Sequence, residues 1–94
     1  MMRILFSPQV PVVEGQRIHY TFGNDVITAE IDGQTDTFDF SEMPDGEAVD
    51  IETTLPVNPI ISARKTNGVL EVVLLNFIGS DATEEERFPT WQEV

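Results

Sequence analysis

The sequence predicts a small, mainly β protein with about six mostly antiparallel strands, arranged in a two-layer sandwich or a barrel-like sheet. Two observations carry this prediction. Apolar and polar residues alternate over most of the chain, as they do in strands with one buried face. Turn dipeptides, Asp32-Gly33 and Asn67-Gly68 above all, separate the alternating runs and suit the two-residue turns of β-hairpins.

Length and charge set the frame for this fold. With 94 residues, the chain is expected to form a single small domain, 1–94, with one modest core. The net charge of -12 is high for this length, but the apolar residues gather in patterned runs rather than thinning out evenly. We therefore expect a folded chain rather than a disordered one.

The first half of the chain predicts four strands. The first covers 3–6 and is expected to be ended by Pro8 and Pro11, because proline cannot donate to a strand ladder and so marks a bend or a sheet edge. Residues 16–40 then predict a three-stranded meander. Its first turn is expected at Gly23-Asn24 and its second at Asp32-Gly33.

Residues 41–59, called the connector below, are rich in proline and glycine and predict an irregular link with a short extended piece at 49–53. A second hairpin follows, with strands on either side of Asn67-Gly68. Its second strand, 69–77, is apolar on both faces and needs cover on both. Either a central place in a two-layer β fold or an oligomer interface would supply that cover.

The last fifteen residues, 80–94, form an acidic segment that predicts one helical turn. Asp81 precedes Glu84 by three residues, which is the spacing of a capping box, and Pro89 is expected to end the turn. Phe88 and Trp91 follow, so the segment is expected either to fold back on the sheet or to remain mobile and present these rings to solvent.

Several classes of chemistry are not expected. There is no cysteine, and the lone histidine, His19, falls on the polar face of its strand. Neither 25–36 nor 39–52 has the oxygen-ligand spacing of a calcium loop. We therefore expect no catalytic residues, no metal and no cofactor. A carboxylate-based hydrolase is a minor alternative function. It would require a concave site with two inward-facing acidic side chains.

Two classes of partner are not expected either. The five basic residues are scattered along an acidic chain, which argues against nucleic acid. No window approaches the length of a membrane span. The chain shows no targeting segment, so we expect a soluble protein that is not secreted.

The acidic middle of the chain leaves two interpretations open. Residues 26–52 hold nine carboxylates and no Lys or Arg. They form either a solvated face that keeps strand edges apart or a docking surface for a basic partner. If the chain binds a partner, the candidate contact residues are Asp45, Glu47, Asp50, Glu52, Phe88 and Trp91.

Four stretches together resemble a known group of proteins: MMRILFSPQ, DTFDFSEMPDGE, VLEVVLLNF and the acidic segment that leads into RFP. They are similar to small proteins encoded in the tail-gene modules of tailed bacteriophages and prophages. The resemblance spans most of the chain and lies in turn and strand residues, so it assigns no catalytic or binding residue.

The resemblance implies a non-enzymatic accessory protein that acts as a small interaction or assembly domain. Its partners would be phage tail proteins, and its location the bacterial host cytoplasm, with association to the virion as a further option. The alternative function is an acidic protein that binds and inhibits a basic host protein.

Overall fold

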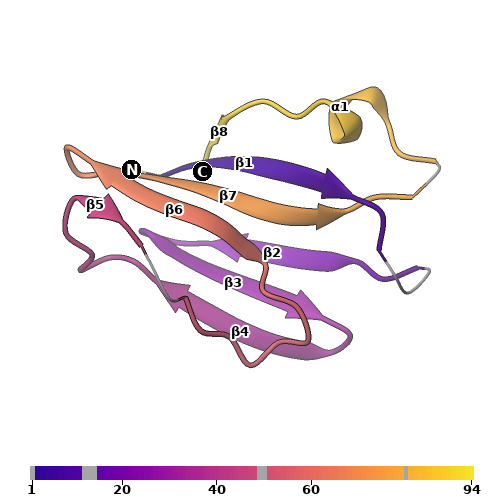
Figure 1. Cartoon of the computed structure of the whole chain (residues 1–94), viewed down its shortest axis with the longest axis horizontal. Helices are drawn as coiled ribbons and strands as arrows, with labels where there is room; N and C mark the ends of the chain where they lie inside the picture. Colours follow the sequence, from indigo (N-terminus) through magenta and orange to yellow (C-terminus); the bar gives the residue numbers. More distant parts are fainter. Residues whose placement is uncertain (1, 12–14, 49–50, 80) are drawn as a thin grey trace.

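The computed structural model describes residues 2–11, 15–48, 51–79 and 81–94. These residues form two β-sheets that pack against each other, with one short helix beside them (Figure 1). The elements in chain order are β1 (Met2–Gln9), β2 (Ile18–Phe22), β3 (Val26–Ile31), β4 (Gln34–Asp39), β5 (Gly46–Glu47), β6 (Ile60–Thr66), β7 (Val69–Phe77), α1 (Glu84–Arg87) and β8 (Gln92–Glu93). The predicted mainly β, two-layer fold is confirmed. The six predicted strands are present, and the two additional strands are only two residues long.

The smaller sheet is the predicted meander, in the order β2-β3-β4, with both neighbouring pairs antiparallel. Asp32 and Gly33 have φ values of 51° and 79°, as the predicted two-residue turn requires. The first turn reaches one residue further than predicted. It closes with a hydrogen bond from the Gly23 amide to the Val26 carbonyl, and Asp25 takes the left-handed conformation.

The larger sheet has the order β5-β6-β7-β1-β8. β6 and β7 form the predicted second hairpin, and the φ values of Asn67 and Gly68 are 51° and 79°. β7 lies in the middle of this sheet, which is the first of the two predicted alternatives. Leu70, Val72 and Leu74 on one face are buried, whereas Val69, Glu71 and Val73 on the other face are only half-buried. One pair departs from the antiparallel rule, because β1 runs parallel to β7 from Met2 opposite Leu70 to Gln9 opposite Phe77.

β1 is longer than the predicted strand and continues through Pro8 to Gln9. The Met2 carbonyl accepts from Val94 on the β8 side, whereas the Gln9 carbonyl accepts from Ile78 on the β7 side. Because successive residues of a strand point their backbone groups to opposite sides, the nitrogen of Pro8 faces away from β7. The ladder to β7 therefore loses no donor at Pro8, and the strand does not have to end there.

The core lies between the sheets and draws on both. Leu70, Val72 and Leu74 of β7 are completely buried, and so are Ile27 and Ile31 of β3. These side chains belong to one buried cluster that includes residues of all six longer strands. On β6 a bulge between Ile60 and Ser62 changes which residues face this cluster.

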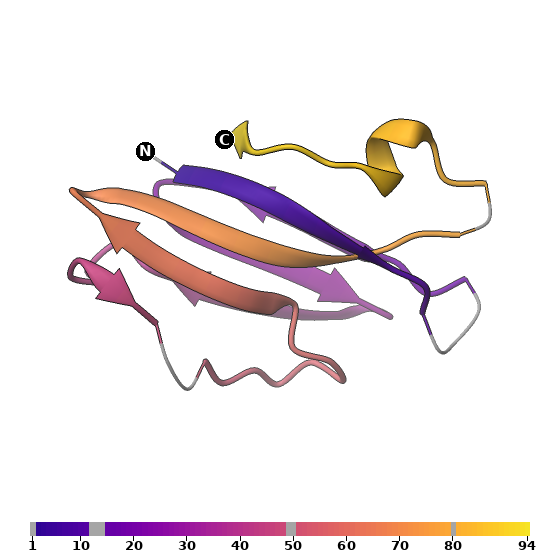
Figure 2. The same cartoon turned by 45° about the horizontal axis from the view of Figure 1, so that its top comes forward.

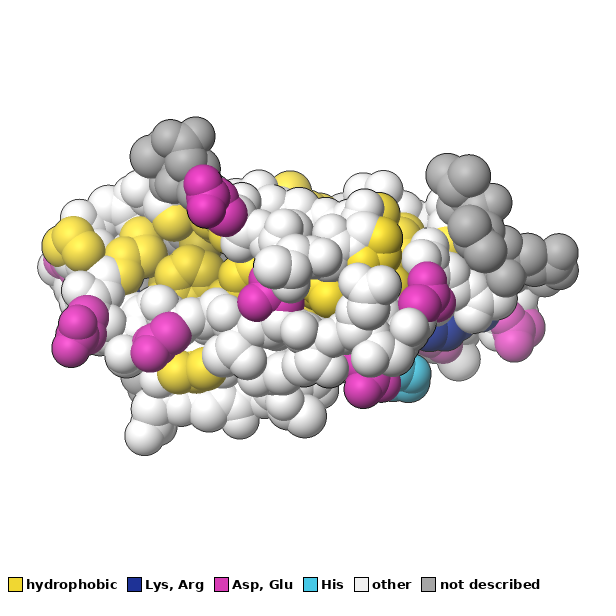
Figure 3. All heavy atoms as spheres, turned by 90° about the horizontal axis from the view of Figure 1, so that it is seen from below, with side chains coloured by type: hydrophobic (Ala, Val, Ile, Leu, Met, Phe, Trp, Pro, Cys, Tyr) yellow, Lys and Arg dark blue, Asp and Glu magenta, His cyan; other side chains and the backbone are white. Residues whose placement is uncertain are grey.

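The connector departs from its prediction. Its short strand is β5, Gly46–Glu47, and not the expected piece at 49–53. Residues 51–53 form no strand, and Val49 and Asp50 lie outside the described residues. Seen from the side of β4 and the connector, hydrophobic side chains gather in a band with acidic side chains around it (Figure 3).

The C-terminal segment contains the predicted helical turn, α1, but its cap is different. Thr83 is the N-cap, and the capping box joins Thr83 to Glu86, so the prediction of Asp81 as the cap was wrong. A hydroxyl on the residue next to the helix reaches the free amides better than a side chain two residues earlier. The chain then returns along β1, and β8 pairs antiparallel with Arg3 and Ile4 (Figure 2).

The described part of the chain contains no helix long and apolar enough to cross a membrane.

Candidate functional site

The five-stranded sheet has one face toward the core and one toward solvent, here called the outer face. Because side chains alternate along a strand, Ile4 and Leu70 point inward while their neighbours Arg3 and Glu71 point outward. Beyond the bulge in β6, Ser62 lies opposite Val73, which is one of the outward residues of β7. The outer face therefore combines charged, polar and apolar side chains.

One set of aligned residues crosses all five strands with alternating charge. The strand registers place Glu47 opposite Arg64, Arg64 opposite Glu71, Glu71 opposite Arg3, and Arg3 opposite Glu93. We call these five residues the charged row. Cross-strand neighbours of opposite charge stabilise a sheet, so the row favours this strand order.

Glu71 is the centre of the charged row. Its Oε2 is 3.2 Å from Nη1 of Arg3, and its Oε1 is 3.2 Å from Nη2 of Arg64. The Glu71 side chain is 19% exposed. Both of its oxygens are thus engaged by guanidinium groups, which leaves this carboxylate poorly placed to act as a general base.

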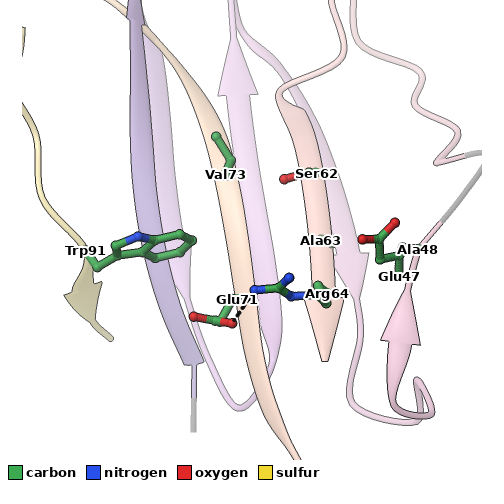
Figure 4. Close-up of a pocket in the computed structure, with 8 residues that line it drawn as sticks. All are labelled: Glu47, Ala48, Ser62, Ala63, Arg64, Glu71, Val73 and Trp91. Atoms are coloured by element: carbon green, nitrogen blue, oxygen red, sulfur yellow. Dashed lines mark hydrogen bonds and ion pairs between the residues drawn. The ribbon is translucent and has the colours of Figure 1, made fainter. Parts of the chain in front are cut away.

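Trp91 lies above one end of the charged row. β8 pairs with the start of β1, so the residue before β8 is carried over the edge of the sheet. The guanidinium carbon of Arg3 is 5.6 Å from the centre of the Trp91 ring, within the range of a cation–π contact. The ring reaches across β1 toward β7, and 39% of the residue stays exposed (Figure 4).

Between Trp91 and β5 the outer face is hollowed. Glu71 and Val73 of β7 and Ser62 and Arg64 of β6 line its floor, and Glu47 with Ala48 lies along the side opposite Trp91. The hollow has a volume of about 260 Å³ and is open to solvent. We call it the outer groove. Its mixture of an aromatic ring, an aliphatic floor and exposed charges is suited to contact with another protein.

The structure places two of the six candidate contact residues, Glu47 and Trp91, on the outer groove. Asp45 has a structural role instead, because its carboxylate accepts hydrogen bonds from the amides of Asn67 and Gly68, at 3.0 and 3.2 Å. It thereby fixes the connector to the β6–β7 turn.

The other candidates are not on the groove. Glu52 is exposed in the connector, and Asp50 lies outside the described residues. Phe88 follows α1, is 73% exposed and lines a separate hollow with Glu85 and Pro89. Of the two rings in the C-terminal segment, only Trp91 therefore folds back on the sheet.

Sequence reasoning missed four residues of the groove floor, Ser62, Arg64, Glu71 and Val73, and also Arg3 of the charged row. One signal was available, because alternation in 69–77 puts Glu71 and Val73 on the same face. The proximity of Arg3 to Glu71 could not be predicted from the sequence, because it depends on the parallel pairing of β1 with β7.

Other acids of the middle segment also bond within the protein. Asp36 Oδ2 accepts from the Thr53 hydroxyl at 2.8 Å and from the Thr54 amide at 3.1 Å. The amide of Thr54, followed by the hydroxyl of Thr53, holds the pKa of Asp36 below its usual value. The hydroxyl and amide of Ser41 lower the pKa of Asp39 in the same way.

Two titratable side chains of β2, Tyr20 and His19, are not among the residues that line the outer groove. The Tyr20 hydroxyl donates to the carbonyl of Leu75, and burial raises the pKa of this phenol. His19 is exposed on the three-stranded sheet, opposite Glu30. Within the described residues, no group of three or more His, Asp or Glu side chains is placed to hold a metal ion.

Comparison of the chain with models of protein families, with curated proteins and with solved structures finds no match.

Proposed function

We propose that the protein is a non-enzymatic interaction domain and that the outer groove is the surface through which it docks. One observation carries this proposal: the C-terminal segment returns along β1 and lays Trp91, still partly exposed, over the outer face of the sheet. Tryptophan is among the residues that contribute most at protein interfaces, because its large ring buries much surface while losing little conformational freedom.

The chemistry of the groove supports docking over catalysis. Glu71 is neutralised by two arginines, and the nearest hydroxyl on the floor belongs to the exposed Ser62. A serine nucleophile needs a base beside it, and the residues that line the groove include no histidine. An open face with an aromatic residue at its margin is instead a common form of protein-binding surface.

The biological setting that we propose is the tail module of a bacteriophage or prophage, with tail proteins as partners. The resemblance of the strand and turn segments to proteins of such modules supports this setting. A small β domain with an exposed groove could serve either as an assembly factor or as a minor tail component.

A second proposal, inhibition of a basic host protein, is favoured by the charge of the chain. Seventeen acidic residues against five basic ones give a net charge of -12, and a field of this sign speeds the approach of a cationic partner. In that case the exposed acids of the connector, such as Glu52, would contribute to binding together with the groove.

The deciding experiment uses a prophage that carries this gene and can be induced. The gene is deleted and then restored either as wild type or as Trp91→Ala, and the particles are counted and inspected by electron microscopy. The tail proposal expects fewer complete tails after deletion and in the Trp91→Ala strain. Normal particles in normal number after deletion would contradict it.

Affinity capture with the purified protein separates the two proposals. Recovery of tail proteins from induced cells, lost with Trp91→Ala, supports the tail function. Recovery of a basic host enzyme whose activity falls on binding supports inhibition and contradicts the tail function.

A further inference from the structure

We infer that the outer groove takes an extended, basic segment of its partner, with aliphatic side chains placed between the cationic ones. This inference rests on the proposed docking function and specifies the chemistry of the partner. It follows from the shape of the groove, from the charges around it and from the exposed part of Trp91.

The shape of the groove favours an extended segment. Its floor is made by two neighbouring strands, β6 and β7, and its sides by Trp91 and by β5 (Figure 4). The groove therefore follows the strand direction, and its volume of about 260 Å³ accommodates a few side chains rather than a folded element. A chain in extended conformation presents alternate side chains to such a floor.

The charges favour a basic segment. The charged row holds three acids, Glu47, Glu71 and Glu93, and two bases, Arg3 and Arg64, so its net charge is -1. The whole chain carries -12, so an acidic partner is repelled and a basic one attracted before contact.

Glu47 is the residue that we assign to the partner's cation. It ends the charged row at the edge strand β5, where it has only one basic neighbour by register, Arg64. That neighbour already bonds to Glu71, with Nη2 3.2 Å from Oε1. Glu47 is exposed, so a lysine or arginine of the partner would extend the alternation of charge by one position.

Trp91 and Val73 are the residues that we assign to the partner's aliphatic side chains. Arg3 lies over the Trp91 ring, and 39% of the tryptophan residue stays exposed beside the groove. Val73 is half-buried on the floor. Covering both removes apolar surface from water, which supplies affinity that charge alone does not.

The chain offers a direct probe of this contact, because Trp91 is its only tryptophan. The purified protein is titrated with the peptide (Lys-Val)4, with (Glu-Val)4 and with (Ser-Val)4, while the tryptophan emission is followed. We expect a saturable change in emission with (Lys-Val)4 and none with (Glu-Val)4. Binding of (Ser-Val)4 should be at least about tenfold weaker than that of the basic peptide.

A matched pair of variants locates the binding. Glu47→Lys changes the charge at the groove, and Glu30→Lys makes the same change on the exposed face of the other sheet. We expect Glu47→Lys to weaken the binding of (Lys-Val)4 by about tenfold, and Glu30→Lys to weaken it by less than about twofold. Thermal melts of both variants check that they fold. If Glu47→Lys does not fold, Glu47→Gln replaces it in the binding measurement.

Three results would overturn the inference: an unchanged tryptophan emission with (Lys-Val)4, equal weakening of peptide binding by both charge reversals, or equal binding of the basic and neutral peptides.

The docking function is tested separately by affinity capture. A captured tail protein could bind wild type and Glu47→Lys equally but be lost with Trp91→Ala. This result would support the docking function and contradict the inference that the partner's segment is basic. If no captured partner depends on Trp91, the docking function itself fails.

Discussion

Lys65 of β6 and Asp25, in the turn just before β3, form an ion pair that links the two sheets, with Nζ 3.6 Å from Oδ2. The Lys65 ammonium also donates to the carbonyl of Phe40 at 2.9 Å, and the residue is 7% exposed. Phe40 in turn donates its amide to the carbonyl of Asp25. The three residues thus form a polar junction at one end of the core.

Lys65→Ala should therefore destabilise the protein strongly. It removes the buried cation that faces Asp25 and the carbonyl of Phe40, and the loss of one partner from a buried pair typically costs about 3–5 kcal/mol. Urea unfolding followed by circular dichroism measures the change. The double variant Lys65→Met, Asp25→Asn should recover part of it, because it removes both charges and keeps the volume. A loss below about 1 kcal/mol in Lys65→Ala would contradict this assignment.

Asp45 should stabilise the β6–β7 hairpin through its bonds to the amides of Asn67 and Gly68. We expect Asp45→Ala to lower the free energy of unfolding by about 1–2 kcal/mol, because two amides lose a charged acceptor. Glu47→Ala, two residues along, is the matched control and should cost less. Equal effects of the two variants would show that the acceptor role of Asp45 is not important.

Asp36 should make the stability depend on acid pH. Its pKa is lowered in the folded protein from the ordinary value of 3.8, mainly by the amide of Thr54 and the hydroxyl of Thr53. The stabilisation from these bonds is therefore fully present above pH 3.8, and it is lost as the pH falls through the lower folded pKa. Since Asp36 is near the surface, we expect a contribution of no more than about 1 kcal/mol.

The measurement compares unfolding curves of wild type and Asp36→Asn between pH 7 and pH 2. The difference in stability should be constant above pH 4 and shrink below it. Glu30→Gln, on the exposed face of the same sheet, controls for the loss of one charge. A difference that grows on acidification would contradict the direction of the shift.

Added salt should raise the melting temperature modestly. Many of the described acids, such as Glu30, Glu42 and Glu52, are exposed, and like charges at this density repel one another. Salt at about 0.15 M shortens their reach to roughly 8 Å. Melting from low to moderate NaCl at pH 7 checks this, and Ca²⁺ or Mg²⁺ at the same ionic strength should add nothing further. Strong extra stabilisation by a divalent ion would instead show a cation site.

Local features of the fold could be predicted from the sequence, because each depends on neighbouring residues. Both hairpin turns carry a residue pair that tolerates positive φ, Asp32-Gly33 and Asn67-Gly68, and both form as predicted. The two apolar faces of 69–77 likewise indicated the central strand. The burial of Lys65 also follows from a local feature, because the second turn places Lys65 opposite Leu70, whose side chain points into the core.

Features that join distant segments could not be predicted in this way. No local pattern states that β1 lies parallel to β7, or that Asp45 reaches the turn 22 residues later. The bulge at Ile61 could not be predicted from the sequence either. Ile60 and Ile61 are the same residue type, although only Ile60 faces the core. The candidate site depends on such long-range pairing, so only Glu47 and Trp91 of its residues were identified beforehand.

The pairing of β1 with β7 also determines when the fold can be completed. Arg3 meets Glu71, 68 residues later in the chain, so β1 has no partner on the β7 side until the second hairpin has been synthesised. The strand pairs of the meander β2-β3-β4 are local in sequence and can form much earlier. Closing so long a loop is entropically costly and raises the contact order, which slows folding. We therefore expect the insertion of β1 beside β7 to be a late folding step, after which the apolar residues Met2 and Ile4 are no longer exposed to other chains.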